Sequence, residues 1–184
     1  MKVKEKTALD APVFGFKNKM TRIVWWLVYS LLFRPSPTPL FGYRRFLLNT
    51  FGARIDKGVN IYPSAKIWLP SNLEVKSNST LGPNVHVYNQ GVIFIGEGVI
   101  ISQGAHLCAS THNYNHSLHP LILAPITIED NVWVCADAFI GPHVHLAEGT
   151  VVGARAVAMK QTEAWSVYSG NPAVKIKDRS WSDK

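Results

Sequence analysis

Cysteine is scarce in this 184-residue chain, which contains only Cys108 and Cys135. Two cysteines cannot build the disulfide framework of a small secreted domain, and their separation matches no structural zinc motif. The sequence therefore predicts free thiols in a reducing compartment, the cytoplasm, and no metal centre.

A long hydrophobic run is also missing. The most apolar stretch, Ile23–Phe33 (IVWWLVYSLLF), has eleven residues, whereas a transmembrane helix needs about 20. It lies well inside the chain and lacks a small-residue cleavage site, so a signal peptide is not indicated. We expect a helix that packs on the body of the protein or lies at a membrane surface, where tryptophan and tyrosine are favoured.

Charge is sparse and unevenly placed. Only 17% of the residues are charged, and the net charge is +7. Residues 1–58 contain eleven Lys or Arg and three acids, whereas residues 59–158 contain three bases and six acids. This basic start suggests a contact with an anionic surface, either a lipid membrane or an anionic carrier. For Lys2, Lys4 and Lys6, a solvated tail is an equal alternative. No nucleic-acid partner is expected, because aromatic residues do not alternate with bases as in a single-strand groove.

What the chain has in abundance is an aliphatic residue at every sixth position. This period fits neither an amphipathic helix nor an alternating strand, and it is the signature of a hexapeptide solenoid, in which stacked coils share one core. The residues that carry it are Ile55, Ile61, Ile67, Val75, Leu81, Val87, Ile95, Ile101, Leu107, Ile128, Val134, Ile140, Leu146, Val152 and Ala158. The sequence therefore predicts an all-β solenoid.

The pattern divides the chain into three parts. We expect a basic, Trp-rich helical extension over residues 1–52, the repeat over residues 53–163, and a short tail over residues 164–184. Within the extension, the proline-rich turn Pro35–Pro39 ends the first helix. Residues Arg44–Phe51 are expected to form a second helix that leads into the first coil.

The repeat is interrupted three times, each time after the third hexad of a coil. Two steps of eight residues follow Ile67 and Val87, and one step of twenty-one follows Leu107. If three hexads make one turn, these interruptions stack at one corner, and loops of repeat proteins often gather on the binding face. The long inserted loop, residues 108–127, is therefore expected to carry the chemistry.

This loop contains three histidines, His112, His116 and His119. His112 follows Leu107 by five positions, so we place it at the end of a regular side, held rigidly above Asn89 of the preceding coil. A fixed imidazole suits a general base near neutral pH. The other two are expected to be solvated loop residues.

Several segments together resemble a known group. The hexads, the His112 loop, Ile128–Trp133 (IEDNVW) and Gly170–Ala173 (GNPA) are similar to left-handed β-helix acyltransferases of the galactoside and maltose acetyltransferase type. The whole chain, with its Trp-rich start and Trp165–Ala173 (WSVYSGNPA), most resembles the WcaF-like acetyltransferases of colanic acid biosynthesis. This resemblance implies a left-handed parallel β-helix, a homotrimer with sites between subunits, and acetyl-CoA as co-substrate.

The resemblance also implies roles for single residues. His112 matches the catalytic histidine of the family, and Trp133 matches a tryptophan that lines the groove for the acceptor and for pantetheine. Ala136 and Ala154 match small residues that border pantetheine, and Lys160 falls near the nucleotide end of the cofactor.

Acceptor recognition is implied less directly. Asn89 falls in the corner where galactoside-type members contact the acceptor, often through an acidic residue, but here the pair Asn89–Gln90 is neutral. The prediction is a coenzyme A-dependent O-acetyltransferase that acts directly on a saccharide hydroxyl, soluble or lipid-linked, in the synthesis of an exopolysaccharide or cell-surface polysaccharide.

Two alternatives share the predicted fold. One is a zinc protein like the γ-type carbonic anhydrases, whose site uses two histidines five apart and one from the previous coil. The loop histidines are spaced by four and three, which does not match. His86 and His106 are one lengthened coil apart and are expected to stack. The other alternative is a non-catalytic scaffold.

Overall fold

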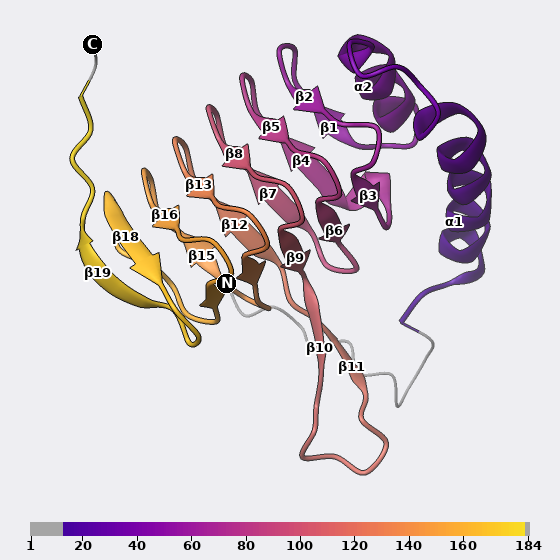
Figure 1. Cartoon of the computed structure of the whole chain (residues 1–184). Helices are drawn as coiled ribbons and strands as arrows, with labels where there is room; N and C mark the ends of the chain where they lie inside the picture. Colours follow the sequence, from indigo (N-terminus) through magenta and orange to yellow (C-terminus); the bar gives the residue numbers. More distant parts are fainter. Residues whose placement is uncertain (1–12, 183–184) are drawn as a thin grey trace.

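The computed structural model describes residues 13–182 as a three-sided stack of short parallel strands with helices at one end (Figure 1). Each coil contributes one strand to each side, and the sides are named here A, B and C in chain order. Side A consists of β1 (Arg54–Ile55), β4 (Leu73–Val75), β7 (Ile93–Ile95), β12 (Ile126–Ile128) and β15 (His145–Leu146).

The other two sides follow the same order along the chain. Side B consists of β2 (Asn60–Ile61), β5 (Thr80–Leu81), β8 (Ile100–Ile101), β13 (Trp133–Val134), β16 (Val151–Val152), β18 (Ser166–Ser169) and β19 (Val174–Asp178). Side C consists of β3 (Lys66–Ile67), β6 (His86–Tyr88), β9 (His106–Cys108), β14 (Phe139–Ile140) and β17 (Val157–Ala158). A short 3₁₀ turn, Pro70–Asn72, joins sides C and A in the first coils.

The repeated aliphatic residues form the core. On side B, Ile61 pairs in register with Leu81, Leu81 with Ile101, Ile101 with Val134, and Val134 with Val152. All five are fully buried. Each hexad therefore places one side chain inside the coil, and stacking makes a continuous column. The predicted left-handed parallel β-helix of hexapeptide repeats is confirmed.

The corners reuse one backbone conformation from coil to coil. The turn between sides A and B contains a residue with positive φ in each coil, at 80° for Gly58 and 60° for Asn78. Glycine and asparagine tolerate this left-handed region best. The later coils repeat it at Gly98, Asn131 and Gly149.

The N-terminal extension covers the first coil. It contains α1 (Phe16–Val28), which continues as a five-residue π-helix, η1 (Tyr29–Phe33), and then α2 (Phe41–Thr50). Trp25 and Phe33 are buried against the solenoid, and the indole N–H of Trp25 donates to the carbonyl oxygen of Ile67 at 2.8 Å. The first helix thus packs on the body of the protein. The second begins at Phe41, three residues earlier than predicted.

The described residues were also searched for a membrane span. No helix within residues 13–182 combines the length and the apolar character needed to cross a bilayer.

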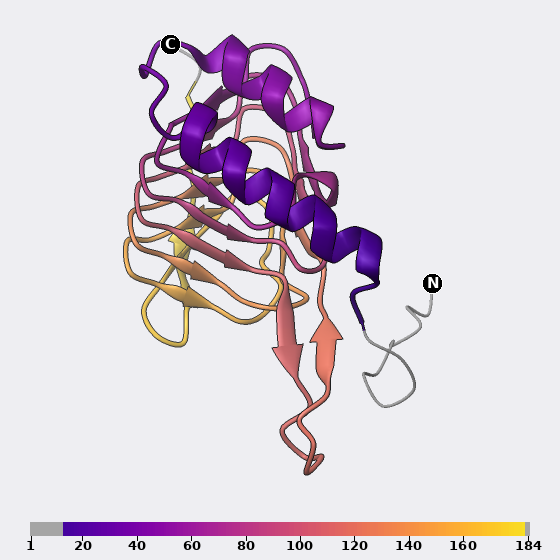
Figure 2. The same ribbon diagram turned by 90° about the vertical axis from the view of Figure 1, so that its right-hand side faces the viewer.

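The long insertion is a β-hairpin, where the sequence indicated an irregular loop. Strand β10 (Ser110–His112) pairs antiparallel with β11 (Leu121–Leu123). The hairpin leaves the corner between sides C and A and projects away from the solenoid (Figure 2).

Candidate active site

The neck of the hairpin is closed by backbone contacts. The carbonyl oxygen of Ala109 accepts hydrogen bonds from the N–H groups of Gly91 and Ala124, both at 3.0 Å. A Cβ at residue 91 would lie 2.6 Å from that oxygen, so only glycine allows this approach. The hairpin is therefore anchored to the preceding coil although its strands lie outside the solenoid.

His112 is the last residue of β10 and pairs across the hairpin with Leu121. Its imidazole is exposed, and its Nδ1 lies 2.6 Å from the carbonyl oxygen of His119. A carbonyl only accepts hydrogen bonds, so Nδ1 carries the proton and donates it. Nε2 of a neutral ring is then unprotonated and is able to take a proton.

The predicted position of His112 above Asn89 is wrong. The regular side ends at Cys108, which pairs with Tyr88, and the chain departs into the hairpin before it reaches His112. Asn89 is fully buried. Its side chain accepts from the N–H of Leu69 at 3.1 Å and donates to the Leu69 carbonyl oxygen at 2.6 Å. Contact with an acceptor would require both bonds to open, so the geometry assigns Asn89 to the fold.

The other two loop histidines are also more ordered than expected. The Nδ1 of His116 accepts the N–H of Leu118 at 3.1 Å. His119 has a positive φ of 44°, and its N–H donates to the carbonyl oxygen of His116 at 2.9 Å. The tip is therefore a built turn that presents the His119 carbonyl to His112. Reasoning from residue types missed this role because a backbone carbonyl has no signature in the sequence.

Three predicted cofactor residues lie along one edge of the solenoid. Trp133, on β13, is 44% exposed, and its indole N–H donates to the hydroxyl oxygen of Ser102 in the preceding coil at 2.9 Å. Ala136 and Ala154 occupy successive turns between sides B and C, and the N–H of Arg155 donates to the Ala136 carbonyl oxygen at 2.9 Å. The edge is open and offers small side chains beside an indole ring.

Lys160 lies elsewhere, two residues after β17 at the corner between sides C and A. Its side chain is exposed and forms no ion pair within residues 13–182.

His112 and the edge beside Trp133 therefore lie at opposite ends of side C. The hairpin leaves where side C ends, whereas the turns with Ala136 and Ala154 lead into side C. Within the described chain, no hydrogen bond or ring contact joins the two groups. A single chain thus presents the base and the apolar edge on separate faces.

The predicted stacking of His86 and His106 is confirmed. Their rings lie 4.4 Å apart at an interplanar angle of 19°. Burial lowers the pKa of both rings, and the nearby His106 and Lys66 lower that of His86 further. Within residues 13–182, no group of three or more His, Cys, Asp or Glu side chains is arranged to hold a metal ion.

No protein-family model matches the chain. Its fold is that of solved hexapeptide-repeat enzymes. A hexapeptide-repeat acetyltransferase from Vibrio cholerae, complexed with acetyl coenzyme A, superposes with a TM-score of 0.80 at 20% identity over 90% of this chain and 91% of that one. A maltose O-acetyltransferase from Clostridium difficile superposes with a TM-score of 0.79 at 21% identity over 89% and 88%. These structural similarities show that the chain has the hexapeptide-repeat fold.

The family follows from a nearer relative. The chain is 40% identical over 167 residues, 90% of its length, to the Escherichia coli protein named "Putative colanic acid biosynthesis acetyltransferase WcaF", of which the match covers 92%. The chain belongs to this family of hexapeptide-repeat acetyltransferases and is an acetyltransferase.

Proposed function

We propose that the protein transfers an acetyl group from acetyl-CoA to a saccharide hydroxyl during polysaccharide biosynthesis, in the cytoplasm. The observation that carries the proposal is the exposed imidazole of His112, whose Nδ1 donates to the His119 carbonyl oxygen while Nε2 makes no hydrogen bond within residues 13–182. The name of the 40%-identical relative supports the substrate class, and the Vibrio cholerae structure supports the donor. Family membership favours this activity over the zinc-dependent and scaffold alternatives.

The chemistry needs a base because an alcohol is barely ionised at neutral pH. The Nε2 of His112 removes the hydroxyl proton as the oxygen attacks the thioester carbonyl. A C–O bond forms, the C–S bond breaks, and the proton passes from the imidazole to the departing thiolate. Transfer is direct, without a covalent enzyme intermediate. The hydrogen bond from Nδ1 stabilises the imidazolium that forms between the two proton transfers.

The cofactor is proposed to lie along the open edge of side B. The half-exposed ring of Trp133 flanks pantetheine and the acceptor, and the small side chains of Ala136 and Ala154 let the chain of the cofactor approach the backbone. Lys160 lies at the other corner, between sides C and A, so the Lys160 that attracts the phosphates at the nucleotide end is proposed to come from the neighbouring subunit. Because the edge beside Trp133 and the hairpin with His112 lie at opposite ends of side C, we propose that the hairpin of one subunit completes the edge of the next in a homotrimer.

The first prediction concerns His112. Replacing it with alanine should lower kcat by about 10²-fold or more, because general-base catalysis contributes at least that much. Binding of coenzyme A, measured by calorimetry, should change little. His116→Ala is the matched control, since it alters another histidine of the same hairpin and should retain most activity. A dead His116→Ala enzyme beside an active His112→Ala enzyme would contradict the assignment.

A peripheral membrane contact is also proposed for the helical extension. The helical segment α1–η1 exposes large apolar side chains, with Trp26 64% and Leu31 70% exposed. Such a segment, flanked by basic residues, is typical of helices that lie in a membrane interface.

A further inference from the structure

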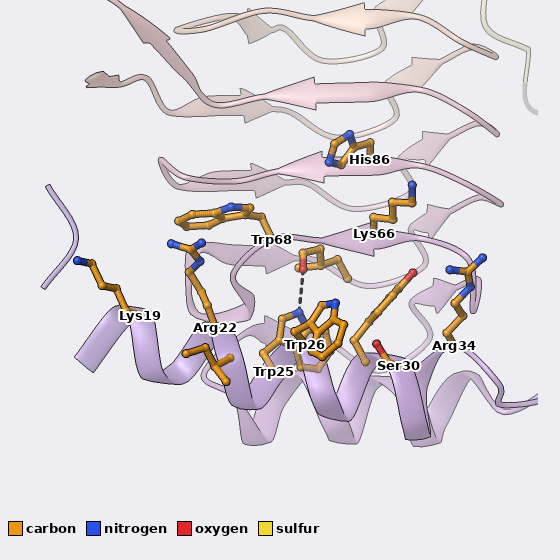
Figure 3. A pocket seen from close by; sticks show the side chains of 12 residues that line it. Lys19, Arg22, Trp25, Trp26, Ser30, Arg34, Lys66, Trp68 and His86 are labelled. Atoms are coloured by element: carbon orange, nitrogen blue, oxygen red, sulfur yellow. Dashed lines mark hydrogen bonds between the residues drawn. The ribbon is translucent and has the colours of Figure 1, made fainter. Parts of the chain in front are cut away.

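A basic cavity lies between the N-terminal helix and the first two coils of side C (Figure 3). Its volume is about 680 Å³. Lys19, Arg22 and Arg34 contribute from the helical segment, and Lys66 contributes from β3. Trp26 and Trp68 are among the aromatic residues of its wall. The cavity is separate from the hairpin and from the edge that contains Trp133.

The four cations of this cavity have no acidic partner among the residues that the structure describes. No carboxylate of residues 13–182 forms an ion pair with any of them. The guanidinium of Arg22 instead lies 4.2 Å from the ring centroid of Trp68. Like charges gathered around a partly enclosed space repel one another. A bound anion would attract all four and so offset this electrostatic repulsion.

His86 completes the wall as an uncharged group. Burial, together with the charges of His106 and Lys66, lowers its pKa. A neutral imidazole adds a hydrogen-bonding group without adding repulsion. The lining therefore combines strong donors with aromatic surface, a combination that suits phosphoryl oxygens attached to an apolar body.

The apolar stripe of the helix adjoins this cavity. Ile23 and Trp26 line it and are 54% and 64% exposed, and Leu27 and Leu31 continue the stripe at 45% and 70%. Ile23, Leu27 and Leu31 are spaced four residues apart and Trp26 follows Ile23 by three, so the four side chains lie on one side of the helix. A free phosphate or a nucleotide would leave this face in water, whereas a lipid bilayer would cover it.

We propose that the cavity binds the phosphoryl headgroup of an anionic membrane lipid while Trp26 and Leu31 enter the bilayer interface. Arg34 and Lys66 hold the phosphoryl oxygens from opposite walls, one on the helical segment and one on the solenoid. This inference deepens the membrane contact proposed above and does not depend on acetyl transfer.

Vesicle flotation of the full-length protein tests the proposal. Vesicles of phosphatidylcholine alone are compared with vesicles that also contain phosphatidylglycerol. The wild-type protein should bind the anionic vesicles at least tenfold more tightly. The Arg34→Gln/Lys66→Gln variant should lose about tenfold or more of that affinity, given the usual contribution of each cation near an anionic surface. Its thermal unfolding should match that of the wild type.

The matched control is Lys57→Gln/Lys177→Gln, which removes the same charge from exposed positions outside the cavity. It should bind within about threefold of the wild type if the attraction is local rather than diffuse. Equal losses in the two double variants would overturn the headgroup site. Equal binding of wild type to neutral and anionic vesicles would overturn it too, but would leave the membrane contact standing.

Two further measurements exclude other occupants. Inorganic phosphate at the same phosphoryl concentration should not displace the protein from anionic vesicles, and full displacement would assign the cavity to a free anion. Trp26→Ser should weaken vesicle binding without changing the molar mass in light scattering. Dissociation of an assembly by this variant would assign the apolar face to a subunit contact and overturn the proposal.

Discussion

Arg44 is the only fully buried charged side chain within residues 13–182. Its Nε donates to the carbonyl oxygen of Ile61 at 2.5 Å, and its terminal nitrogens donate to Ser36 Oγ, the Pro37 carbonyl and the Thr38 carbonyl. Burial lowers its pKa. The guanidinium thus provides hydrogen-bond donors for acceptors at the edge of the first coil and in the turn between the helices.

Replacing Arg44 with methionine should lower the free energy of unfolding by about 3 kcal/mol or more, because several buried carbonyls would lose their donor. Urea denaturation followed by circular dichroism measures this loss. Arg45→Met serves as the control, since Arg45 makes one such bond, to Val59 at 2.8 Å, and should cost about 1 kcal/mol. Equal stability of the Arg44→Met protein and the wild type would refute this role.

Sequence periodicity was sufficient to predict the interior residues but not these contacts. Ile61, Leu81 and Ile101 were predicted to be buried because each hexad repeats the same environment. Arg44 carries no such pattern, and arginine is so rarely fully buried that the residue type alone does not predict these contacts. The same holds for the carbonyl of His119, since backbone acceptors are invisible to reasoning from residue type.

Side C contains a ladder of aromatic rings that links its strands. His86 stacks on His106, and His106 meets Phe139 edge to face at 5.3 Å. Both histidines have a pKa below the ordinary value of 6.5, mainly because of burial. The unfolded chain therefore binds more protons than the folded chain once the pH falls through about 6.5. Stability is full above that pH and falls as the pH falls toward the folded-state pKa values.

This ladder makes stability sensitive to pH. The urea midpoint of the wild type should decrease between about pH 7.5 and pH 5.5, and His106→Phe should show about half of that decrease, because one of the two rings no longer titrates. Phenylalanine preserves the stacking against Phe139. His116→Gln should keep the full dependence. An unchanged dependence in His106→Phe would show that the ladder does not titrate in this range.

The sequence predicted the position of the hairpin but not its secondary structure. An insertion after Leu107 was evident from the loss of the hexad period, and its place at a corner followed from counting three hexads per coil. Its antiparallel strands were not predicted, because Ser110–His112 and Leu121–Leu123 are only three residues each. Periodicity needs longer segments to distinguish a strand from a loop. Because the hairpin was not predicted, His112 was wrongly expected to lie above Asn89.

At the scale of the whole molecule, the separation of His112 from Trp133 predicts that each active site is shared between two subunits. A His112→Ala subunit and an Ala136→Trp subunit should each form inactive trimers, the first without a base and the second with a blocked edge. Co-expressed in equal amounts, they should recover about a quarter of the wild-type activity, because a shared site needs one intact group from each of two neighbours. Light scattering should give the mass of three chains.

The controls for this experiment are the two variants mixed after separate purification, which should stay inactive if trimers do not exchange subunits. A co-expressed mixture without activity would show that each site lies within one chain. A monomeric mass in light scattering would contradict the proposed homotrimer.

Other segments of the chain form hydrogen bonds with the backbone at both ends of the solenoid. At the first coil, Asn49 exchanges hydrogen bonds with the backbone of Ile55, and Arg44 and Trp25 donate to the carbonyls of Ile61 and Ile67, one on each side.

At the last coil, the N–H of Thr162 donates to the carbonyl oxygen of His145, the N–H of Val157 donates to the carbonyl oxygen of Gly170, and β18 and β19 of the tail extend side B beyond β16. Open strand edges of stacked coils are templates on which a further copy adds. The helices and the tail therefore act as stops, and a chain stripped of both would be expected to grow end to end into fibres.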